Sequence, residues 1–425
     1  MKIFSLFFFL LFSLTTTQTF AADFTVNQIT DQHDANVLDG ICDLDLATAE
    51  PECTLRAAIE QANAIGSNDR VLFNLPDFST ITLTTAGGGE MQVAGTLEII
   101  GSGANRLTIN GGAGQNRIFY TNLATVIISG VTLTGGDGAG KGIDGFGGAI
   151  FADDSTLTLD SVYVTGNTAG NTGSVRLRRG TNHKIINSTF SANRTQDGGS
   201  CGNVTNENST LTVINSTFSG NTTSGAGGGF CGTGNTKLRN VTITGNSAIE
   251  GGGGGIHYDN GTLDIGNSIV AGNMGRNGVY WDPGDAGPDF RVRSRGIIQT
   301  MGFNFIGNNF GTGVAFPAGI LNSSDIVGTR SAPLDPMLAA LAGNGGTTPT
   351  HALLSGSPLI DRGDNSLAVD PLTNLPILTD QRGLSRFVDG DRNGTPTVDI
   401  GAYEQQLIPL RPRRRTGGRF LSGYE

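Results

Sequence analysis

Five segments of the chain repeat one short pattern at nearly even spacing. They are LTLDSVYVTGN from Leu157, IINSTFSAN from Ile185, LTVINSTFSGN from Leu211, LRNVTITGN from Leu238 and LDIGNSIVAGN from Leu263. Each ends in an asparagine, and successive closing asparagines lie 26, 28, 25 and 27 residues apart. Apolar residues alternate within the segments, which is typical of strands and not of helices. A repeat of this length predicts an all-β solenoid with one coil per repeat, and parallel crossovers make it a right-handed parallel β-helix.

Equivalent positions in the repeats are expected to line up between coils. Phe190 and Phe218 predict a buried aromatic column, which Ile243 and Ile269 would continue. The closing asparagines predict a structural ladder in which each side-chain amide hydrogen-bonds the next; they are Asn193, Asn221, Asn246 and Asn273. Glycine accounts for 66 of 425 residues and gathers where the coils should turn, because it adopts left-handed conformations without steric cost.

Residues 1–21 have the features of a secretory signal peptide. Lys2 is followed by an apolar run from Ile3 to Leu14 and by Thr19-Phe20-Ala21, a small-residue cleavage signal. The apolar run is too short to span a bilayer, and no later segment is long and apolar enough to do so. We therefore expect an exported protein, extracellular or at the cell surface, without a transmembrane segment in the mature chain. A net charge of −10 gives no basic surface for nucleic acid.

The four cysteines of an exported chain are expected to pair. Cys42 and Cys53 lie 11 residues apart before the repeats begin. Cys201 and Cys231 each follow the closing asparagine of their coil by eight to ten residues, so they occupy the same corner of successive coils. Stacked strands lie about 4.8 Å apart, a separation that suits a disulfide. The sequence predicts bridges Cys42–Cys53 and Cys201–Cys231; two stacked free thiols are the alternative for the second pair.

The segment before the repeats resembles a known motif. Cys53-Thr54-Leu55-Arg56-Ala57-Ala58-Ile59, which follows FTVNQITDQHD, is similar to the CSLREA-type N-terminal motif of bacterial exported proteins, although Ala57 stands where the family usually has an acid. Leu55, Ala58, Ile59 and Ala62 share one helical face. We expect residues 22–70 to form a cap with a short helix across the open end of the solenoid, where it would cover the unpaired edge of the first coil; an ordinary leader helix is the alternative.

The repeat region and the C-terminal part each carry a further resemblance. Gly147-Gly148-Ala149-Ile150 and the FxxN segments resemble repeats of polymorphic outer-membrane proteins, which supports a pectin-lyase-like β-helix over residues 71–307. Residues 308–406 contain NGG-x-TPTHAL, GSP-x-ID, DQRG and DIGAYE, and resemble the choice-of-anchor Q region that precedes surface anchors. We expect a β-rich module there, followed by a disordered basic tail over residues 407–425.

A D-x-D-x-N-G string in that module suggests a cation site. Asp389, Asp391 and Asn393 alternate along the chain, and Asp399 lies ten residues beyond the first acid. This spacing can place oxygen ligands around one calcium ion. Position twelve is Ile400 instead of the glutamate of an EF-hand, so a Gly/Asn turn between two strands is the alternative. No other cofactor is expected.

The sequence favours a binding or structural protein over an enzyme. Lyases and hydrolases of this fold need clustered acids, and the only adjacent pair on the solenoid body, Asp153 and Asp154, lies at a turn where Asp is common. We therefore expect a monomeric, adhesin-like or structural surface protein that contacts polysaccharide or cell-surface glycans through its repetitive polar faces. A polysaccharide lyase or glycoside hydrolase acting on acidic polysaccharide is the alternative, with Asp153 and Asp154 as its catalytic candidates.

Overall fold

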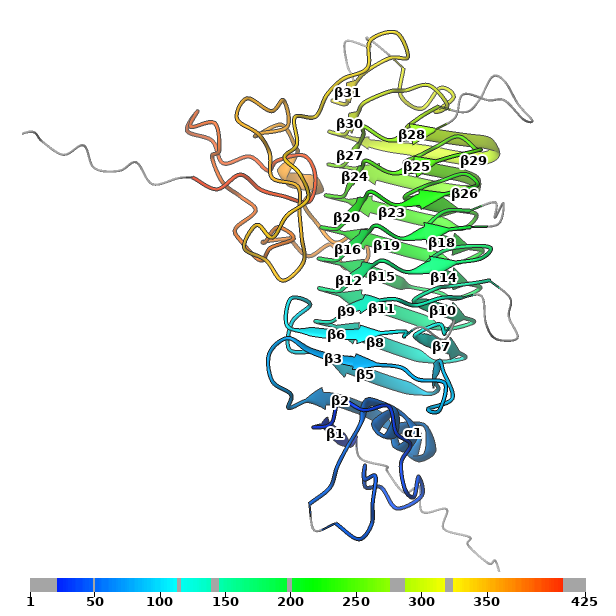
Figure 1. Ribbon diagram of the computed structural model, residues 1–425. Coiled ribbons are helices and arrows are strands. Elements are labelled where there is room, and N and C mark those ends of the chain that lie inside the picture. Colours follow the sequence, from blue (N-terminus) through cyan, green and yellow to red (C-terminus); the bar gives the residue numbers. More distant parts are fainter. Residues whose placement is uncertain are drawn as a thin grey trace, which may run out of the picture.

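The computed structural model describes residues 21–48, 50–112, 116–138, 145–196, 201–275, 287–317 and 324–407. The predicted signal peptide and basic tail lie almost entirely outside these residues. The chain winds into a right-handed parallel β-helix with very little helix (Figure 1). The fold class predicted from the 25–28-residue repeat is confirmed.

Strands of successive coils stack in four parallel columns. The first column holds β1 (Asp23–Val26), β2 (Asn68–Phe73), β5 (Thr96–Ile100), β8 (Thr125–Ser129), β11 (Thr156–Asp160), β15 (His183–Ile186), β19 (Thr210–Ile214) and β23 (Asn235–Arg239). The second holds β4 (Met91–Val93), β7 (Phe119–Asn122), β10 (Ile150–Asp153), β14 (Val175–Arg178), β18 (Val204–Glu207) and β22 (Phe230–Gly232). Two long strands, β26 (Ile256–Gly266) and β29 (Phe290–Gly302), run through both columns and join them into one sheet.

The other two columns form sheets of their own. The third column holds β3 (Ser79–Thr82), β6 (Leu107–Asn110), β9 (Thr132–Thr134), β12 (Tyr163–Thr165), β16 (Thr189–Ser191), β20 (Thr217–Ser219), β24 (Thr242–Thr244), β27 (Ile269–Ala271), β30 (Phe305–Ile306) and β31 (Ile326–Val327). The fourth holds β13 (Thr168–Ala169), β17 (Arg194–Thr195), β21 (Thr222–Thr223), β25 (Ser247–Ala248) and β28 (Met274–Gly275). β31 pairs with β30, so strand pairing continues past residue 307.

The predicted column is confirmed for three of its four members and corrected for the fourth. Phe190 and Phe218 are fully buried, and their rings stack with centroids 5.0 Å apart. Ile243 pairs with Phe218, but Val270, not Ile269, continues the column. Counted back from the closing asparagine, Val270 is the equivalent residue, and a one-residue slip turns a side chain to the other face of a strand. Ile269 instead faces outward, where it packs against the C-terminal module.

The asparagine ladder is also confirmed. The Nδ2 atoms of Asn167, Asn193, Asn221 and Asn246 each donate to the Oδ1 atom of the next asparagine at 2.8–3.0 Å. Asn273 closes the ladder on Asp289 Oδ1 at 2.9 Å. Burial raises the pKa of Asp289 to about 7. The ladder satisfies the polar groups of the bends that lead into the fourth column, deep inside the solenoid.

Helix α1 (Leu55–Ile65) lies across the open end of the first coil, as the capping prediction requires (Figure 1). Thr54 caps its N-terminus by accepting from the Ala57 N–H group. Gly66 ends it in the left-handed conformation, with φ 69°. The buried face, which includes Leu55 and Ile59, packs beside β1, β2 and β4. The helix therefore closes the core at this end.

The C-terminal module folds back along the outer side of the third column (Figure 1). Its β-structure, among the described residues after β31, consists of isolated antiparallel bridges, and a short 3-10 helix η1 (Asn365–Leu367) lies between them. This is less strand than the β-rich module expected. It docks on the solenoid through the apolar cluster that includes Ile269 and through hydrogen bonds. Thr189 Oγ1 donates to the Pro349 carbonyl at 2.6 Å, and Thr217 Oγ1 to Gln381 Oε1 at 2.6 Å.

Candidate functional site

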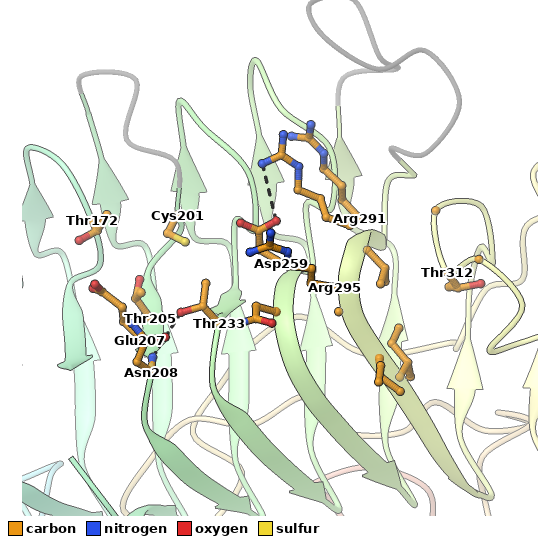
Figure 2. A pocket seen from close by; sticks show the side chains of 18 of the residues that line it. Thr172, Cys201, Thr205, Glu207, Asn208, Thr233, Asp259, Arg291, Arg295 and Thr312 are labelled. Atoms are coloured by element: carbon orange, nitrogen blue, oxygen red, sulfur yellow. Dashed lines mark hydrogen bonds and ion pairs between the residues drawn. The ribbon is translucent and has the colours of Figure 1, made fainter. Parts of the chain in front are cut away.

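A cleft of about 1220 Å³ opens on the outer face of the second column (Figure 2). Its floor is built by outward side chains of β14, β18, β26 and β29, and residues 311–315 contribute to its lining. Arg176, Thr205 and Arg291 all line the cleft and belong to one register row, in which Arg176 pairs with Thr205 and the row continues through β22 and β26 to Arg291. The regular stacking of coils therefore places side chains from distant sequence positions in one line.

The cleft is richer in arginine than in acids, although the chain carries a net charge of −10. Four guanidinium groups line it, from Arg176, Arg291, Arg293 and Arg295, against the carboxylates of Glu207 and Asp259. Both carboxylates have an arginine partner. Arg176 Nε donates to Glu207 Oε2 at 2.9 Å, and Arg293 Nη1 lies 3.6 Å from Asp259 Oδ1.

The arginines differ in burial and in their contacts. Arg176 is buried, and its Cζ atom lies 3.7 Å from the centre of the Phe146 ring. Burial lowers the pKa of its guanidinium, while the hydrogen bond and charge of Glu207 oppose that shift. Arg293 and Arg295, by contrast, are exposed on β29. A fixed arginine at one end and exposed arginines at the other can contact carboxylate or sulfate groups spread along a chain-like ligand.

Both predicted disulfides are confirmed. The Cα atoms of Cys42 and Cys53 lie 5.2 Å apart, and those of Cys201 and Cys231 lie 5.4 Å apart. Cys231 sits in the register row of the cleft, between Thr205 and His257, and Cys201 lines the cleft. The second bridge therefore ties the segment that carries Cys201 onto the cleft floor.

Asp153 and Asp154 do not line the cleft; they lie at the corner where β10 ends. Arg178 donates through Nε to Asp153 Oδ1 at 2.7 Å, and Arg179 Nη2 lies 3.0 Å from Asp153 and 2.8 Å from Asp154. Burial disfavours the Asp153 carboxylate, but its hydrogen bond and charge pairing with Arg178 and Arg179 outweigh burial and lower its pKa. These contacts give both acids a structural role at the corner.

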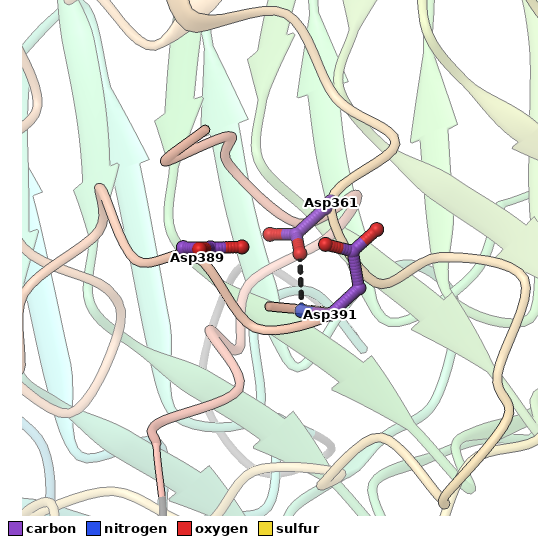
Figure 3. Close-up of side chains that lie close together, drawn as sticks. All are labelled: Asp361, Asp389 and Asp391. Carbon is purple, nitrogen blue, oxygen red and sulfur yellow. Dashed lines mark hydrogen bonds between the residues drawn. The ribbon is translucent and has the colours of Figure 1, made fainter. Parts of the chain in front are cut away.

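The residues expected to bind calcium fall into two acidic groups that share Asp361. Carboxylate oxygens of Asp361, Asp389 and Asp391 lie within 4.8 Å of one another (Figure 3). Asp399 belongs instead to a buried group with Asp361 and Glu404. Asn393 Nδ2 donates to Asp391 Oδ2 at 3.0 Å. A calcium ion at the predicted ligands stays a prediction.

Asp361 was not found from the sequence, because it lies 28 residues before Asp389 and enters the group through the fold. It accepts from the Gly390 N–H group at 3.1 Å. Burial is the main cause that raises the pKa of Asp361, and the like charge of Asp391 adds to it. Burial also raises the pKa of Asp399 to about 7 and that of Glu404 to about 10. The only signal for Asp361 was its place in the GSP-x-ID segment.

Among known proteins, the matches to this chain are to solved structures. No protein-family model and no curated protein matches the chain. A search of solved structures finds a crystal structure of the pectate lyase Pel9A, with a TM-score of 0.36 and 13% identity, covering 91% of this chain and 97% of that chain. In the described part of the chain, no helix has the length and apolar character needed to cross a membrane.

Proposed function

We propose that this protein is exported and acts at the cell surface or in the medium by binding acidic polysaccharide or cell-surface glycans in the arginine-lined cleft, as an adhesin-like or structural protein. The observation that carries the proposal is the excess of arginine over acid in a cleft of an otherwise acidic protein. Guanidinium groups recognise carboxylate and sulfate oxygens in a planar, two-pronged geometry. Two disulfides agree with a protein that folds in an oxidising compartment.

Contact without turnover is favoured because each acid in the cleft is paired with an arginine. Glu207 is bonded to Arg176, and Asp259 lies beside Arg293. The arginine beside each carboxylate competes for the oxygen atoms that would have to reach a substrate in general acid–base catalysis. Cleavage of acidic polysaccharide is the competing function, and it is an outcome of the experiment below.

The experiment measures binding of the mature protein to polygalacturonate and alginate at low and moderate salt, with dextran as the neutral polymer. The test variant is Arg293→Gln with Arg295→Gln. The matched control is Arg106→Gln with Arg194→Gln, two exposed arginines that do not line the cleft. Each exposed charge contact contributes about 0.5–1 kcal/mol, so the test variant should bind roughly 5–30-fold more weakly, and the control should match the wild type.

Three results would contradict the proposal. Equal weakening by the test and control variants would mean that general charge, not the cleft, drives binding. Equal binding to dextran would remove the electrostatic basis. Release of unsaturated sugars from either polyuronide would replace binding with lyase activity, and loss of that release in Asp153→Ala with Asp154→Ala would assign the reaction to the corner acids.

A further inference from the structure

The amide of Gln61 has an unusual set of neighbours in the N-terminal cap. Gln61 lies on helix α1 and is fully buried. Its Nε2 atom is surrounded by four oxygens of the preceding loop: the Asn36 carbonyl at 2.8 Å, the Ile41 carbonyl at 2.9 Å, Asp34 Oδ1 at 3.0 Å and Asp39 Oδ1 at 3.2 Å. Its Oε1 atom has no hydrogen-bond partner.

Hydrogen bonding alone does not account for this arrangement. A side-chain amide carries two N–H groups and cannot serve four acceptors fully. Two of the four acceptors are carboxylates, and among the described residues no salt bridge includes Asp34 or Asp39. The buried Oε1 atom meanwhile loses its hydrogen bonds to water without replacing them. The backbone N–H groups of Asn36 and Ile41 also donate to Asp34 Oδ1 and Asp39 Oδ1, but these donors and the Gln61 nitrogen are all neutral and leave the two carboxylate charges unbalanced.

A half-turn of the amide exchanges its nitrogen and oxygen with almost no change in shape. Gln61 Oε1 would then lie 2.8–3.2 Å from each of the other four oxygens, a separation that suits neighbouring ligands that each lie roughly 2.3–2.6 Å from one calcium ion. We propose that Asp34 Oδ1, Asp39 Oδ1, the carbonyls of Asn36 and Ile41, and Gln61 Oε1 bind a calcium ion.

The ligand set suits calcium in number, charge and position. Calcium takes six to eight oxygens, from carboxylates, carbonyls and water, in a flexible geometry. Two carboxylates balance its charge. Gly40, at φ 80°, turns the loop so that Asp39 and the Ile41 carbonyl face the same point. Magnesium demands a tighter octahedral shell and keeps more of its water, so a site built from five protein oxygens favours calcium.

The site would join a loop with little apolar support to the helix that closes the solenoid. Leu38 is 85% exposed and Ile41 is 50% exposed, so the loop buries few apolar groups of its own. Gln61 belongs to the buried face of α1, and the Cys42–Cys53 bridge begins one residue after Ile41. Calcium bound here would therefore hold the cap in place over the edge of the first coil.

The test uses the mature full-length protein in an Asp389→Asn, Asp391→Asn background, which removes two acids of the partly exposed C-terminal group as a second source of binding. Calorimetric titration with calcium chloride should show one ion per chain. Asp39→Asn removes a charged ligand and should weaken binding roughly tenfold or more. Gln61→Glu should tighten binding, because it replaces an amide oxygen with a carboxylate. The control is Asp45→Asn in the same segment. Among the described residues, the Asp45 side chain accepts only from the Ala47 N–H group, so this variant should bind as the background does.

Thermal unfolding distinguishes the ion site from an ordinary amide network. With a calcium site, Gln61→Glu is destabilised in EGTA and restored by calcium. With an amide network, Gln61→Glu is destabilised in both buffers, and that result overturns the proposal. Absence of binding up to roughly 10 mM calcium, beyond the dissociation constants of extracellular calcium modules, also overturns it, as does equal binding of magnesium or unchanged binding in Asp39→Asn.

Discussion

Replacing one rung of the buried asparagine ladder, Asn221→Ala, tests whether the ladder stabilises the coils. Asn221 Oδ1 accepts from the backbone N–H of Asn193 at 3.2 Å and from its Nδ2 at 3.0 Å. Asn221 Nδ2 donates to Asn246 Oδ1 at 2.8 Å and to the Phe190 carbonyl at 2.9 Å. All four bonds lie inside the solenoid, where water cannot replace them.

The loss of stability in Asn221→Ala depends on which neighbouring groups keep another hydrogen-bond partner. Asn193 Nδ2 still donates to the Val164 carbonyl, and Asn246 Oδ1 still accepts from the backbone N–H of residue 221. The Asn193 backbone N–H keeps no partner, and one such buried group costs about 1–3 kcal/mol. The three other hydrogen bonds that Asn221 makes are also lost, at a smaller cost each, so the free energy of unfolding should fall by about 3 kcal/mol in total. For a chain of this size that corresponds to a drop of roughly 4 °C in Tm.

Circular dichroism during heating, at matched concentration and scan rate, measures the change in Tm. The double variant Asn193→Ala with Asn221→Ala should lose less than the sum of the two single losses, because both single changes remove the same hydrogen bond. A change in Tm below about 1 °C for Asn221→Ala, or strict additivity in the double variant, would refute the claim that the ladder acts as a chain of coupled bonds.

Two further predictions concern the acids and the disulfide. Burial raises the folded-state pKa values of Asp399 to about 7 and Glu404 to about 10. Above about pH 4, the folded protein therefore binds more protons than the unfolded chain, and its free energy of unfolding should fall as pH rises from 5 to 8. Glu404→Gln should make the free energy of unfolding, measured by denaturant titration, depend less on pH. Cys201→Ser with Cys231→Ser should cost less than the roughly 3.6 kcal/mol that the entropic estimate gives for this 30-residue loop, because strand ladders already hold the loop. A larger loss by denaturant titration would contradict this.

The regular parts of the fold could be predicted from the sequence, because equivalent positions of successive repeats stack on one another in every coil. The closing asparagines fixed the register of Phe190 and Phe218, and corner positions fixed the Cys201–Cys231 pair. Ile269 lies one residue outside the column, because Val270 precedes Asn273 by three residues just as Phe218 precedes Asn221 by three. Register alone would have corrected the prediction.

The repeat could not predict sites whose residues come from segments outside the regular coils. Arg293 and Arg295 lie on β29, past the last clear repeat, so the sequence did not show that they share a cleft with Arg176. Asp361 reaches Asp389 and Asp391 only through the loops of the C-terminal module. Gln61 meets its four oxygens because helix α1 packs beside a loop that begins 27 residues earlier. None of these contacts has a fixed spacing along the chain.

The alternation of the strands separates the cleft from the core. In the second column the inward row contains Val175, Val204, Phe230, Ile256 and Phe290, all fully buried.

The outward row begins one residue later in each strand and holds the cleft residues Arg176, Thr205 and Arg291. Because neighbouring positions point to opposite faces, outward residues can change without altering the packing of the inward row. The outward row departs from the polar Thr, Ser and Asn pattern of the repeats by carrying arginine at both ends. Under the proposed function, this departure, and not the repeat itself, is the part of the sequence that would specify the ligand.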